Sequence, residues 1–211
     1  MENFKIIFKI SKSPIEYNQA INFLEKKVGE VYQNKKKEFV WILEHPSIYT
    51  RGISSKNEDL LIPDLFPVIN TNRGGQFTYH GPGQIVVYFA INLNNRGKEI
   101  KKFVRMVELW IINILKDFDI KSYADPKNIG IWVKNNNLDN KIAAIGIRVK
   151  KWIAYHGFAI NINVPKENYR GIVPCGIKNK GIANIADYTK IPSKFDLENS
   201  IKKNFEKLFK N

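Results

Sequence analysis

The most constraining feature of the sequence is a short apolar run, Phe39–Leu43, which contains no polar residue. An uninterrupted run of this length fits a strand that is buried on both faces of a sheet. Residues 84–93 are also strongly strand-like, because β-branched and aromatic side chains dominate them. The 211 residues, 44% of them hydrophobic, hold enough apolar material for one compact domain with a sizeable core.

Helical periodicity is present in three segments. Ser13-Pro14-Ile15-Glu16 has the pattern of an N-cap, a first-turn proline and a capping-box glutamate, and it predicts a helix from about 14 to 32. Apolar spacing predicts a second helix from about 98 to 118, whose apolar face should pack on the sheet, and a third near 196–209, opened by Asp196.

Three apolar segments, 129–133, 141–149 and 153–162, are separated by polar turns and predict a three-stranded meander. Proline and glycine in residues 44–52 indicate a loop, and the glycine-rich stretch that ends at Gly83 indicates a loop between two strands. The sequence has no internal repeat, linker or low-complexity tract. We therefore predict a single α+β domain, residues 1–211, with a mixed sheet packed by helices.

The composition of the chain indicates which partners, cellular compartment and metal sites to expect. With 34 Lys+Arg against 20 Asp+Glu, the formal net charge of +14 favours anionic partners. The N-terminus lacks the cationic leader of a secretory signal, and no apolar run approaches the roughly 20 residues that span a bilayer. We expect a cytoplasmic protein with no membrane association. A single cysteine excludes an internal disulfide, and no Cys/His cluster has structural-zinc spacing, so we expect no metal.

Glycines and polar side chains that could bind a ligand are most concentrated in one segment, Arg73-Gly-Gly-Gln-Phe-Thr-Tyr-His-Gly-Pro-Gly-Gln84. Glycines so close together imply unusual backbone dihedrals or a close approach to a ligand. One interpretation is an anion or carbonyl site made by Arg73 and glycine N–H groups, lined by Thr78, Tyr79 and His80. The other is a tight strand connection in which the glycines only shape turns. The residues alone leave both open, because the pattern fits neither GxGxxG nor the P-loop.

Two more side chains could carry chemistry. Cys175 lies between Pro174 and Gly176, which indicates an irregular turn; a lone cysteine is usually a small buried hydrophobe, but a turn thiol beside a cation would be held partly as thiolate. Its base or charge partner could be His45, His80, His156 or a lysine. Lys141 opens an apolar strand, where a lysine is usually solvated; if it faces inward, it could take and give a proton.

The segment Arg73–Gln84 closely resembles the signature of the lipoyl(octanoyl) transferase family of lipoate biosynthesis. Three further segments resemble the same family in the same order: residues 45–52, residues 141–148 leading into 156–161, and Pro174-Cys175-Gly176. The resemblance spans roughly residues 14–188. It implies the α+β catalytic fold shared with biotin protein ligases and lipoate-protein ligases.

The resemblance also implies an activity and its residues. The family transfers an octanoyl group from octanoyl-acyl carrier protein to a lysine of lipoyl domains, without ATP or another cofactor. By position, Cys175 matches the acyl-thioester nucleophile and Lys141 the lysine that lowers its pKa. The matching substrate-binding positions are Arg73, Gly74, Gly75, Gln76, Phe77, Thr78, Tyr79, His80, Ala144, Ile145, Gly146, Gly157, Phe158 and Ala159.

This chemistry agrees with the residues, since a cysteine thiolate can attack a thioester and form an acyl-enzyme. Backbone N–H groups near Gly176 and Gly146 are candidates for holding the oxyanion. An apolar tunnel for the acyl tail is expected near Ala143, Ala144, Phe77, Tyr79 and Phe158. One departure stands out: Ile182-Ala183-Asn184-Ile185 replaces the family's usual Val/Ile-Thr-Ser-Leu, so the hydroxyls expected there are absent.

The expected acceptors are the lipoyl domains of 2-oxoacid dehydrogenase complexes and the glycine cleavage H protein, served by a monomer. One alternative is an ATP-dependent lipoate or biotin ligase of the same fold, which would adenylate a free acid and be indifferent to Cys175. A second alternative is a basic nucleic-acid-binding domain. No nucleic-acid-binding motif supports it, so we expect no nucleic acid. The basic surface is then better explained by the acidic character of acyl carrier proteins and lipoyl domains.

Overall fold

The computed structural model describes residues 5–34, 37–135, 138–173 and 180–209. The helices are α1 (Tyr17–Gln33), α2 (Ile100–Lys116) and α3 (Lys194–Phe209), with short 3-10 helices at Asn57–Asp59, Leu93–Arg96, Lys166–Tyr169 and Ile185–Asp187. The strands are β1 (Lys5–Ile10), β2 (Lys37–Leu43), β3 (Ile48–Arg51), β4 (Val68–Asn70), β5 (Thr78–His80), β6 (Gln84–Asn92), β7 (Tyr123–Asp125), β8 (Asn128–Asn135), β9 (Leu138–Lys150), β10 (Ile153–Asn161) and β11 (Gly181–Ile182).

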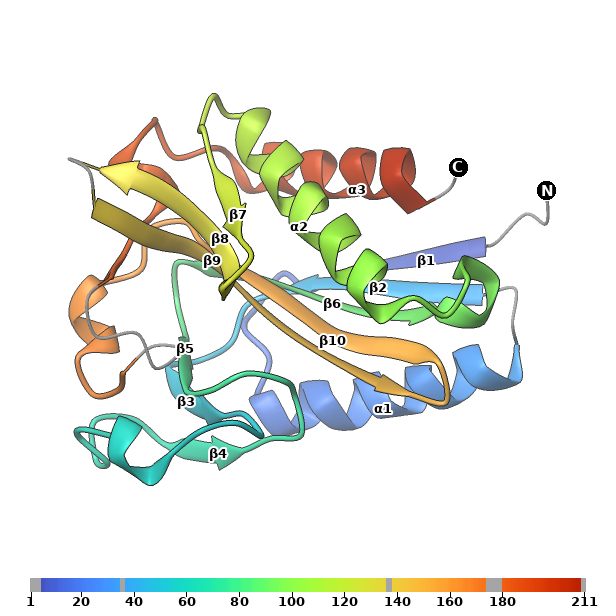
Figure 1. Ribbon diagram of the computed structural model, residues 1–211, viewed down its shortest axis with the longest axis horizontal. Helices are drawn as coiled ribbons and strands as arrows, with labels where there is room; N and C mark the ends of the chain where they lie inside the picture. The colour runs from blue at the N-terminus through green and yellow to red at the C-terminus, as the bar shows by residue number, and fades with distance from the viewer. Residues whose placement is uncertain (1–4, 35–36, 136–137, 174–179, 210–211) are drawn as a thin grey trace.

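Most strands form one mixed sheet, in the order β1-β2-β6-β10-β9-β8-β7, and β11 pairs with β9 off this path. β1 runs parallel to β2 and β11 parallel to β9, whereas the remaining neighbours are antiparallel. A small second sheet, β4-β3-β5, lies beside one end of the large one (Figure 1). The α+β prediction is therefore confirmed, and so is the meander, which β8, β9 and β10 form.

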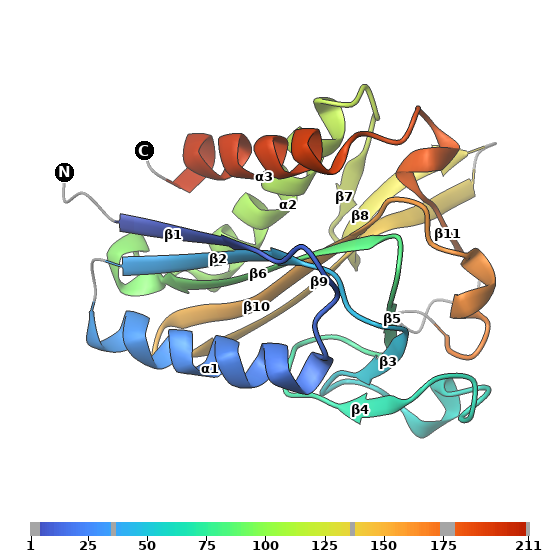
Figure 2. The same cartoon turned by 180° about the vertical axis from the view of Figure 1, so that it is seen from behind.

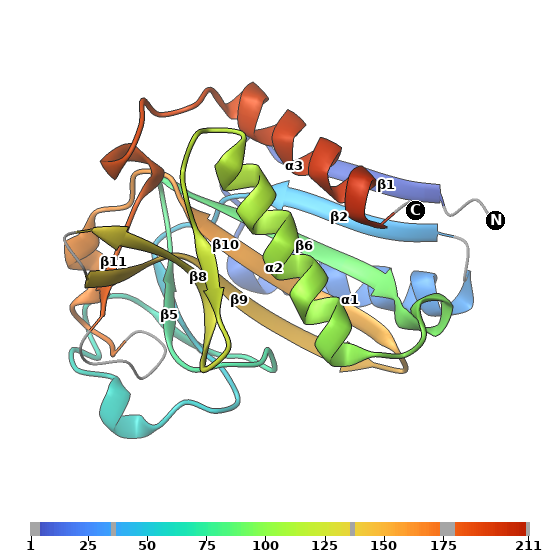
Figure 3. The same cartoon turned by 45° about the horizontal axis from the view of Figure 1, so that its top comes forward.

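Helices cover both faces of the large sheet, with α1 on one face and α2 and α3 on the other (Figures 1 and 3). The alternation of side chains along β6 shows why both are needed. Val87 and Phe89 pack in the cluster under α2 and α3, whereas Val86 and Tyr88 pack in the cluster under α1. The same alternation in β2 buries all of Phe39–Leu43, as the uninterrupted apolar run predicts.

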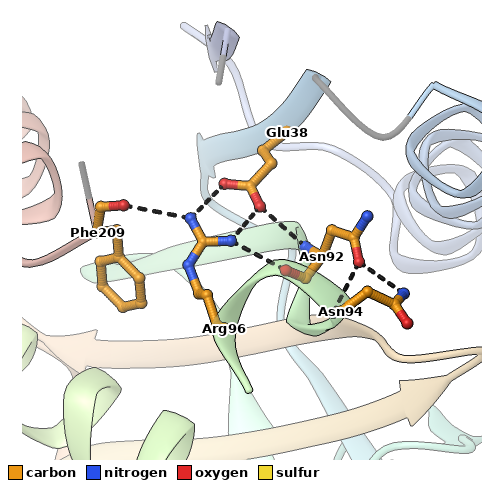
Figure 4. Close-up of polar contacts among 5 residues, drawn as sticks. All are labelled: Glu38, Asn92, Asn94, Arg96 and Phe209. Atoms are coloured by element: carbon orange, nitrogen blue, oxygen red, sulfur yellow. Dashed lines mark hydrogen bonds and ion pairs between the residues drawn. The ribbon is translucent and has the colours of Figure 1, made fainter. Parts of the chain in front are cut away.

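A buried ion pair fastens the end of α3 to the sheet (Figure 4). Glu38 of β2 is fully buried and contacts the guanidinium of Arg96, whose Nη2 lies 2.8 Å from Glu38 Oε2. The same nitrogen donates to the carbonyl oxygen of Phe209 at 3.2 Å. The Glu38 carboxylate also accepts from the backbone N–H of Asn92 at 3.0 Å. The Glu38–Arg96 pair thus joins the ends of β2 and β6 to the last turn of α3.

Local expectations differ from the structure at four places. α1 begins at Tyr17 with Glu16 as its N-cap, so the predicted start at Ser13-Pro14 is wrong, and Glu16 makes no side-chain cap bond. α3 begins at Lys194 rather than near Asp196; Asp196 instead shares a hydrogen bond with Ser193, whose Oγ accepts from the Asp196 N–H. Residues 44–52 contain β3, and the glycine-rich stretch contains β5. These short strands pair with each other, a long-range contact that local patterns do not reveal.

No helix of the described residues combines the length and apolarity that crossing a membrane requires.

Candidate active site

Where β9 and β10 pair, one patch of the sheet carries only alanine and glycine residues, which leave space above the backbone. Ala144 lies opposite Ala159, and Gly146 lies opposite Gly157. A Cβ atom on Gly157 would fall 1.9 Å from the carbonyl oxygen of Val87, and one on Gly146 would fall 3.0 Å from Cδ of Arg73. A side chain is therefore excluded at Gly157. A side chain at Gly146 would press on the loop that carries Arg73, which lies directly against β9.

A cavity occupies this patch. It holds about 470 Å³ of space free of atoms, part of it open to solvent. Its walls come from α1, from the loop 73–80 and from strands β6, β9 and β10. Figure 2 shows α1 lying across the face of the large sheet. The lining residues are Tyr17, Arg73, Gly75, Gln76, Thr78, His80, Val86, Tyr88, Ala144, Ile145, Gly146, His156, Gly157, Phe158 and Ala159.

Arg73 organises the loop that covers the cavity. Its Nη2 donates to the carbonyl oxygens of Thr50 at 2.7 Å and Gln76 at 2.8 Å, and its Nη1 donates to that of Gly74 at 3.0 Å. The side chain is buried, so these bonds replace the water that the guanidinium gives up. Arg73 thus closes residues 73–76 into a compact turn against β3 while its charge remains beside the cavity.

Three buried histidines lie in this region: His80 and His156 line the cavity, and the His45 ring lies behind them against His80. His45 Nδ1–H donates to the carbonyl oxygen of Ile15 at 2.6 Å, and its Nε2 accepts from the Tyr88 hydroxyl at 2.8 Å. His80 Nδ1–H donates to Gln84 Oε1 at 2.7 Å. Because burial penalises the charged form, the pKa of His45 falls to about 4 and the pKa of His80 to about 3. Both rings are therefore neutral near pH 7.

His156 lines the cavity and has an unusual backbone conformation for a residue other than glycine, with φ at 64°. Its Nε2–H donates to Asn72 Oδ1 at 2.7 Å, which leaves Nδ1 as a bare acceptor. Burial, with the charges of Arg73 and Arg148, lowers the His156 pKa to about 3. Within the described chain, His156 Nδ1 and Gln76 Oε1 are buried without a hydrogen-bond partner. The cavity therefore offers two acceptors to a ligand.

Lys141 lies in β9 and is only 5% exposed, so the strand-end pattern that suggested a solvated lysine was misleading. Its ammonium donates to the carbonyl oxygen of Ile129 at 3.0 Å and lies 4.6 Å from the centroid of the Trp132 ring. The side chain fits because Gly130 has none: a Cβ there would lie 3.3 Å from Nζ. Lys141 is thus an inward-facing cation held by a carbonyl and an aromatic face.

A second cavity, with about 910 Å³ of space free of atoms and partly open to solvent, includes Lys141 in its wall. It shares Gly75, Gln76 and Ile145 with the first cavity, so the two adjoin along β9 and the glycine loop. The arrangement places an apolar chamber next to a chamber that contains a lysine ammonium.

The structure gathers most of the residues predicted to bind substrate. Those on the first cavity are Arg73, Gly75, Gln76, Thr78, His80, Ala144, Ile145, Gly146, Gly157, Phe158 and Ala159, and Gly74 lines the second. Phe77 and Tyr79 instead pack in a separate cluster with Tyr49 and Tyr169, away from the expected tunnel. Cys175, with its neighbours Pro174 and Gly176, lies outside the described residues.

Sequence reasoning missed three parts of the wall: Tyr17 of α1, and Val86 and Tyr88 of β6. Their side chains have the spacing of ordinary core residues, and nothing in the local pattern distinguishes them. The strand register supplies the missing signal, because Tyr88 pairs with Gly157 and Val86 with Ala159. A large residue beside a glycine leaves space that only the assembled sheet reveals.

Comparisons with known proteins agree with this arrangement. Residues 16–208 match the family model of the lipoyl protein ligase A/B catalytic domain. An octanoyltransferase of Wolbachia sp. subsp. Brugia malayi is 45% identical over 201 residues, covering 95% of this chain and 98% of the relative.

The fold also matches solved structures at low sequence identity. The bipartite lipoate protein ligase of Thermoplasma acidophilum superposes with a TM-score of 0.78 at 12% identity, over 98% of this chain and 84% of that one. The biotin protein ligase of Leishmania major gives 0.56 at 13%, over 96% and 72%. At these identities, both comparisons show that the fold is shared. The family model and the close relative, taken with the two cavities, establish that this chain belongs to the octanoyltransferase family within the lipoyl protein ligase A/B catalytic-domain proteins.

Proposed function

We propose that this protein is an octanoyltransferase that moves an octanoyl group from acyl carrier protein to a lysine of lipoyl domains, through a thioester on Cys175. The observation that carries the proposal is the pair of adjoining cavities, one largely apolar and one with the buried ammonium of Lys141 in its wall. The apolar chamber suits an acyl chain, and the second chamber suits the reacting thioester. One catalytic domain, residues 1–211, acting in the cytoplasm would carry the reaction.

The first step forms the acyl-enzyme. The Cys175 thiolate attacks the thioester carbonyl carbon, a carbon–sulfur bond to the enzyme forms, and the bond to the phosphopantetheine sulfur breaks. The departing thiolate takes up one proton from the Lys141 ammonium, which leaves Lys141 as a neutral amine for the second step. As an ammonium, Lys141 stabilises the attacking thiolate; the backbone N–H groups of Gly146 and Gly176 are the proposed oxyanion donors.

The second step transfers the acyl group to the acceptor. The neutral ε-amine of the acceptor lysine attacks the enzyme thioester, a carbon–nitrogen bond forms, and the bond to Cys175 breaks. The amine loses one proton, which Lys141 in its neutral form would accept, and the enzyme returns to its starting state. His45, His80 and His156 are neutral near pH 7, because burial lowers the pKa of His45 to about 4 and the pKa values of the other two to about 3.

The partners follow from this chemistry. Octanoyl-acyl carrier protein is the proposed donor, and the lipoyl domains of 2-oxoacid dehydrogenase complexes and the glycine cleavage H protein are the proposed acceptors, served by a monomer. The formal charge of +14 supports association with acidic proteins.

The proposal is tested by incubating the protein with octanoyl-acyl carrier protein and measuring intact mass. The wild type should gain the mass of one octanoyl group, and Cys175→Ser should gain no thioester. Lys141→Met should slow modification of a lipoyl domain about 100-fold or more, the scale of lost acid–base catalysis. Lys150→Met, at the exposed end of the same strand, is the matched control and should transfer normally.

Two results would contradict the proposal. One is a wild-type protein that never becomes acylated while a lipoyl domain is modified. The other is modification that requires ATP and a free acid and survives replacement of Cys175, which would indicate a ligase.

A further inference from the structure

Lys180 lies where the chain returns to the sheet beside Lys141. The two residues after it form β11, in which Gly181 pairs with Asn140 and Ile182 pairs with Lys141. The backbone N–H of Ala183 then donates to the carbonyl oxygen of Lys141 at 2.9 Å. The strand that follows Lys180 is therefore bonded to the backbone of Lys141 itself.

Two carboxylates hold the Lys180 ammonium. Its Nζ lies 3.2 Å from Asp125 Oδ2 at the end of β7 and 3.3 Å from Asp139 Oδ2 in β9. The Tyr123 hydroxyl donates to Asp139, and Asn128 donates to Asp125 at 2.6 Å, so both acceptors are fixed in place. Although burial works against it, the charges and hydrogen bonds of the two carboxylates raise the Lys180 pKa.

The same ammonium shares an aromatic ring with Lys141. Lys180 Nζ lies 4.3 Å from the centroid of Trp132, and Lys141 Nζ lies 4.6 Å from it. Trp132 is the cross-strand partner of Lys141, and its Nε1–H donates to the carbonyl oxygen of Asn128 at 2.9 Å. Two cations so close to one ring repel each other, and the carboxylates of Asp125 and Asp139 offset this repulsion at Lys180.

We propose that Lys180 is a positioning residue for acyl transfer: by joining β7, β9 and β11 around Trp132, it fixes the direction and surroundings of the Lys141 ammonium. The proposal rests on the proposed function, in which Lys141 serves Cys175. Without Lys180, β11 would lose its tie to β7, and the two carboxylates would lose the ammonium they hold. Lys141 would then be the remaining cation at Trp132 and could turn towards them, away from the second cavity.

The test compares Lys180→Met with Lys180→Arg, which keeps the charge. Lys180→Met should lower kcat for octanoyl transfer about 10- to 100-fold, the loss expected when a reacting group is misplaced by about 1 Å. KM for octanoyl-acyl carrier protein should stay within about twofold, because substrate binding is not affected. Lys180→Arg should recover most of kcat. Lys190→Met, which removes an exposed lysine ten residues further along the chain, should behave as wild type.

A second measurement separates positioning from folding. Cys175 is the only cysteine, so its alkylation by iodoacetamide at pH 7 reports the reactivity of that thiol alone. Alkylation of Lys180→Met should be slowed together with kcat while its thermal midpoint stays close to that of wild type. Asp139→Asn should also slow transfer, and its effect should not add fully to that of Lys180→Met.

Normal transfer by Lys180→Met would overturn the inference, as would a loss explained entirely by a lower thermal midpoint. Failure of the proposed function has a different signature, since the wild type would then transfer no octanoyl group at all.

Discussion

At the scale of single residues, Gly130 decides whether Lys141 can face inward. Its backbone has φ at 132°, which disfavours any side chain. A Cβ atom would also lie 2.9 Å from the carbonyl oxygen of Ala143 and 3.0 Å from Cε of Lys141. The empty space above Gly130 is filled by the lysine side chain, so the glycine is part of the proposed site.

Gly130→Ala should therefore displace Lys141 and lower octanoyl transfer about 10- to 100-fold. The matched control is Gly29→Ala in α1, where the added Cβ meets no atom within 4 Å. That change should leave transfer unaltered and stabilise the protein by about 0.5–1 kcal/mol, because alanine loses less backbone entropy in a helix. Transfer rates and urea unfolding of both variants check this, and full activity in Gly130→Ala would contradict it.

Lys141 also shows what sequence reasoning misses at this scale. A lysine at the start of an apolar strand is usually solvated, but β9 extends back to Leu138, so position 141 lies inside the strand. Trp132 from β8 and Ile182 from β11 then cover it from both sides. These neighbours are distant in sequence, and burial therefore depends on pairings that no local pattern contains.

At the scale of elements, the anchoring of α3 depends on Arg96. Arg96→Met would leave the buried carboxylate of Glu38 without its cation, so we expect a loss of about 3–5 kcal/mol in the free energy of unfolding. Arg105→Met, on the exposed side of α2, should change stability by less than about 0.5 kcal/mol. Denaturant unfolding of the two variants checks the difference. Equal stabilities would show that the helix is held by apolar packing alone.

Elements with strong periodicity were predictable, and short ones were not. The second helix and the meander are confirmed because their patterns extend over many residues and each buries a continuous face. The local pattern predicts loops where β3 and β5 lie, because strands of four and three residues are too short to show an alternation of apolar and polar side chains. The same limit applies to the site: the glycine loop was visible in the sequence, but the wall that β6 supplies was not.

At the scale of the whole molecule, the three histidines make stability depend on pH, and they are the only histidines in the chain. Each has a folded pKa of about 3 to 4, against 6.5 when unfolded. Above pH 6.5 the three histidines are neutral in both the folded and the unfolded state, so the free energy of unfolding is not reduced by their titration. As the pH falls below 6.5, only the unfolded state takes up protons, so stability is lost at about 1.4 kcal/mol per pH unit for each histidine.

Urea unfolding at pH 7.5, 6 and 5 should therefore show a steep loss, approaching roughly 4 kcal/mol per pH unit for the three histidines together. His45→Asn should flatten this dependence by about a third, although its stability at pH 7.5 should be lower because the bond to Ile15 is altered. A free energy of unfolding that stays constant from pH 7.5 to 5 would contradict the buried neutral rings.

Strand β9 carries one wall of the first cavity, the proposed catalytic ammonium and the pairing site of β11 on a single stretch of backbone. Successive residues of a strand face opposite sides, so inserting or deleting one residue within β9 would turn every later group to the wrong face. Over evolutionary time, changes in length should thus be tolerated in the surface loops and excluded from β9. The spacing of residues along β9 therefore sets the distance between the first cavity and Lys141.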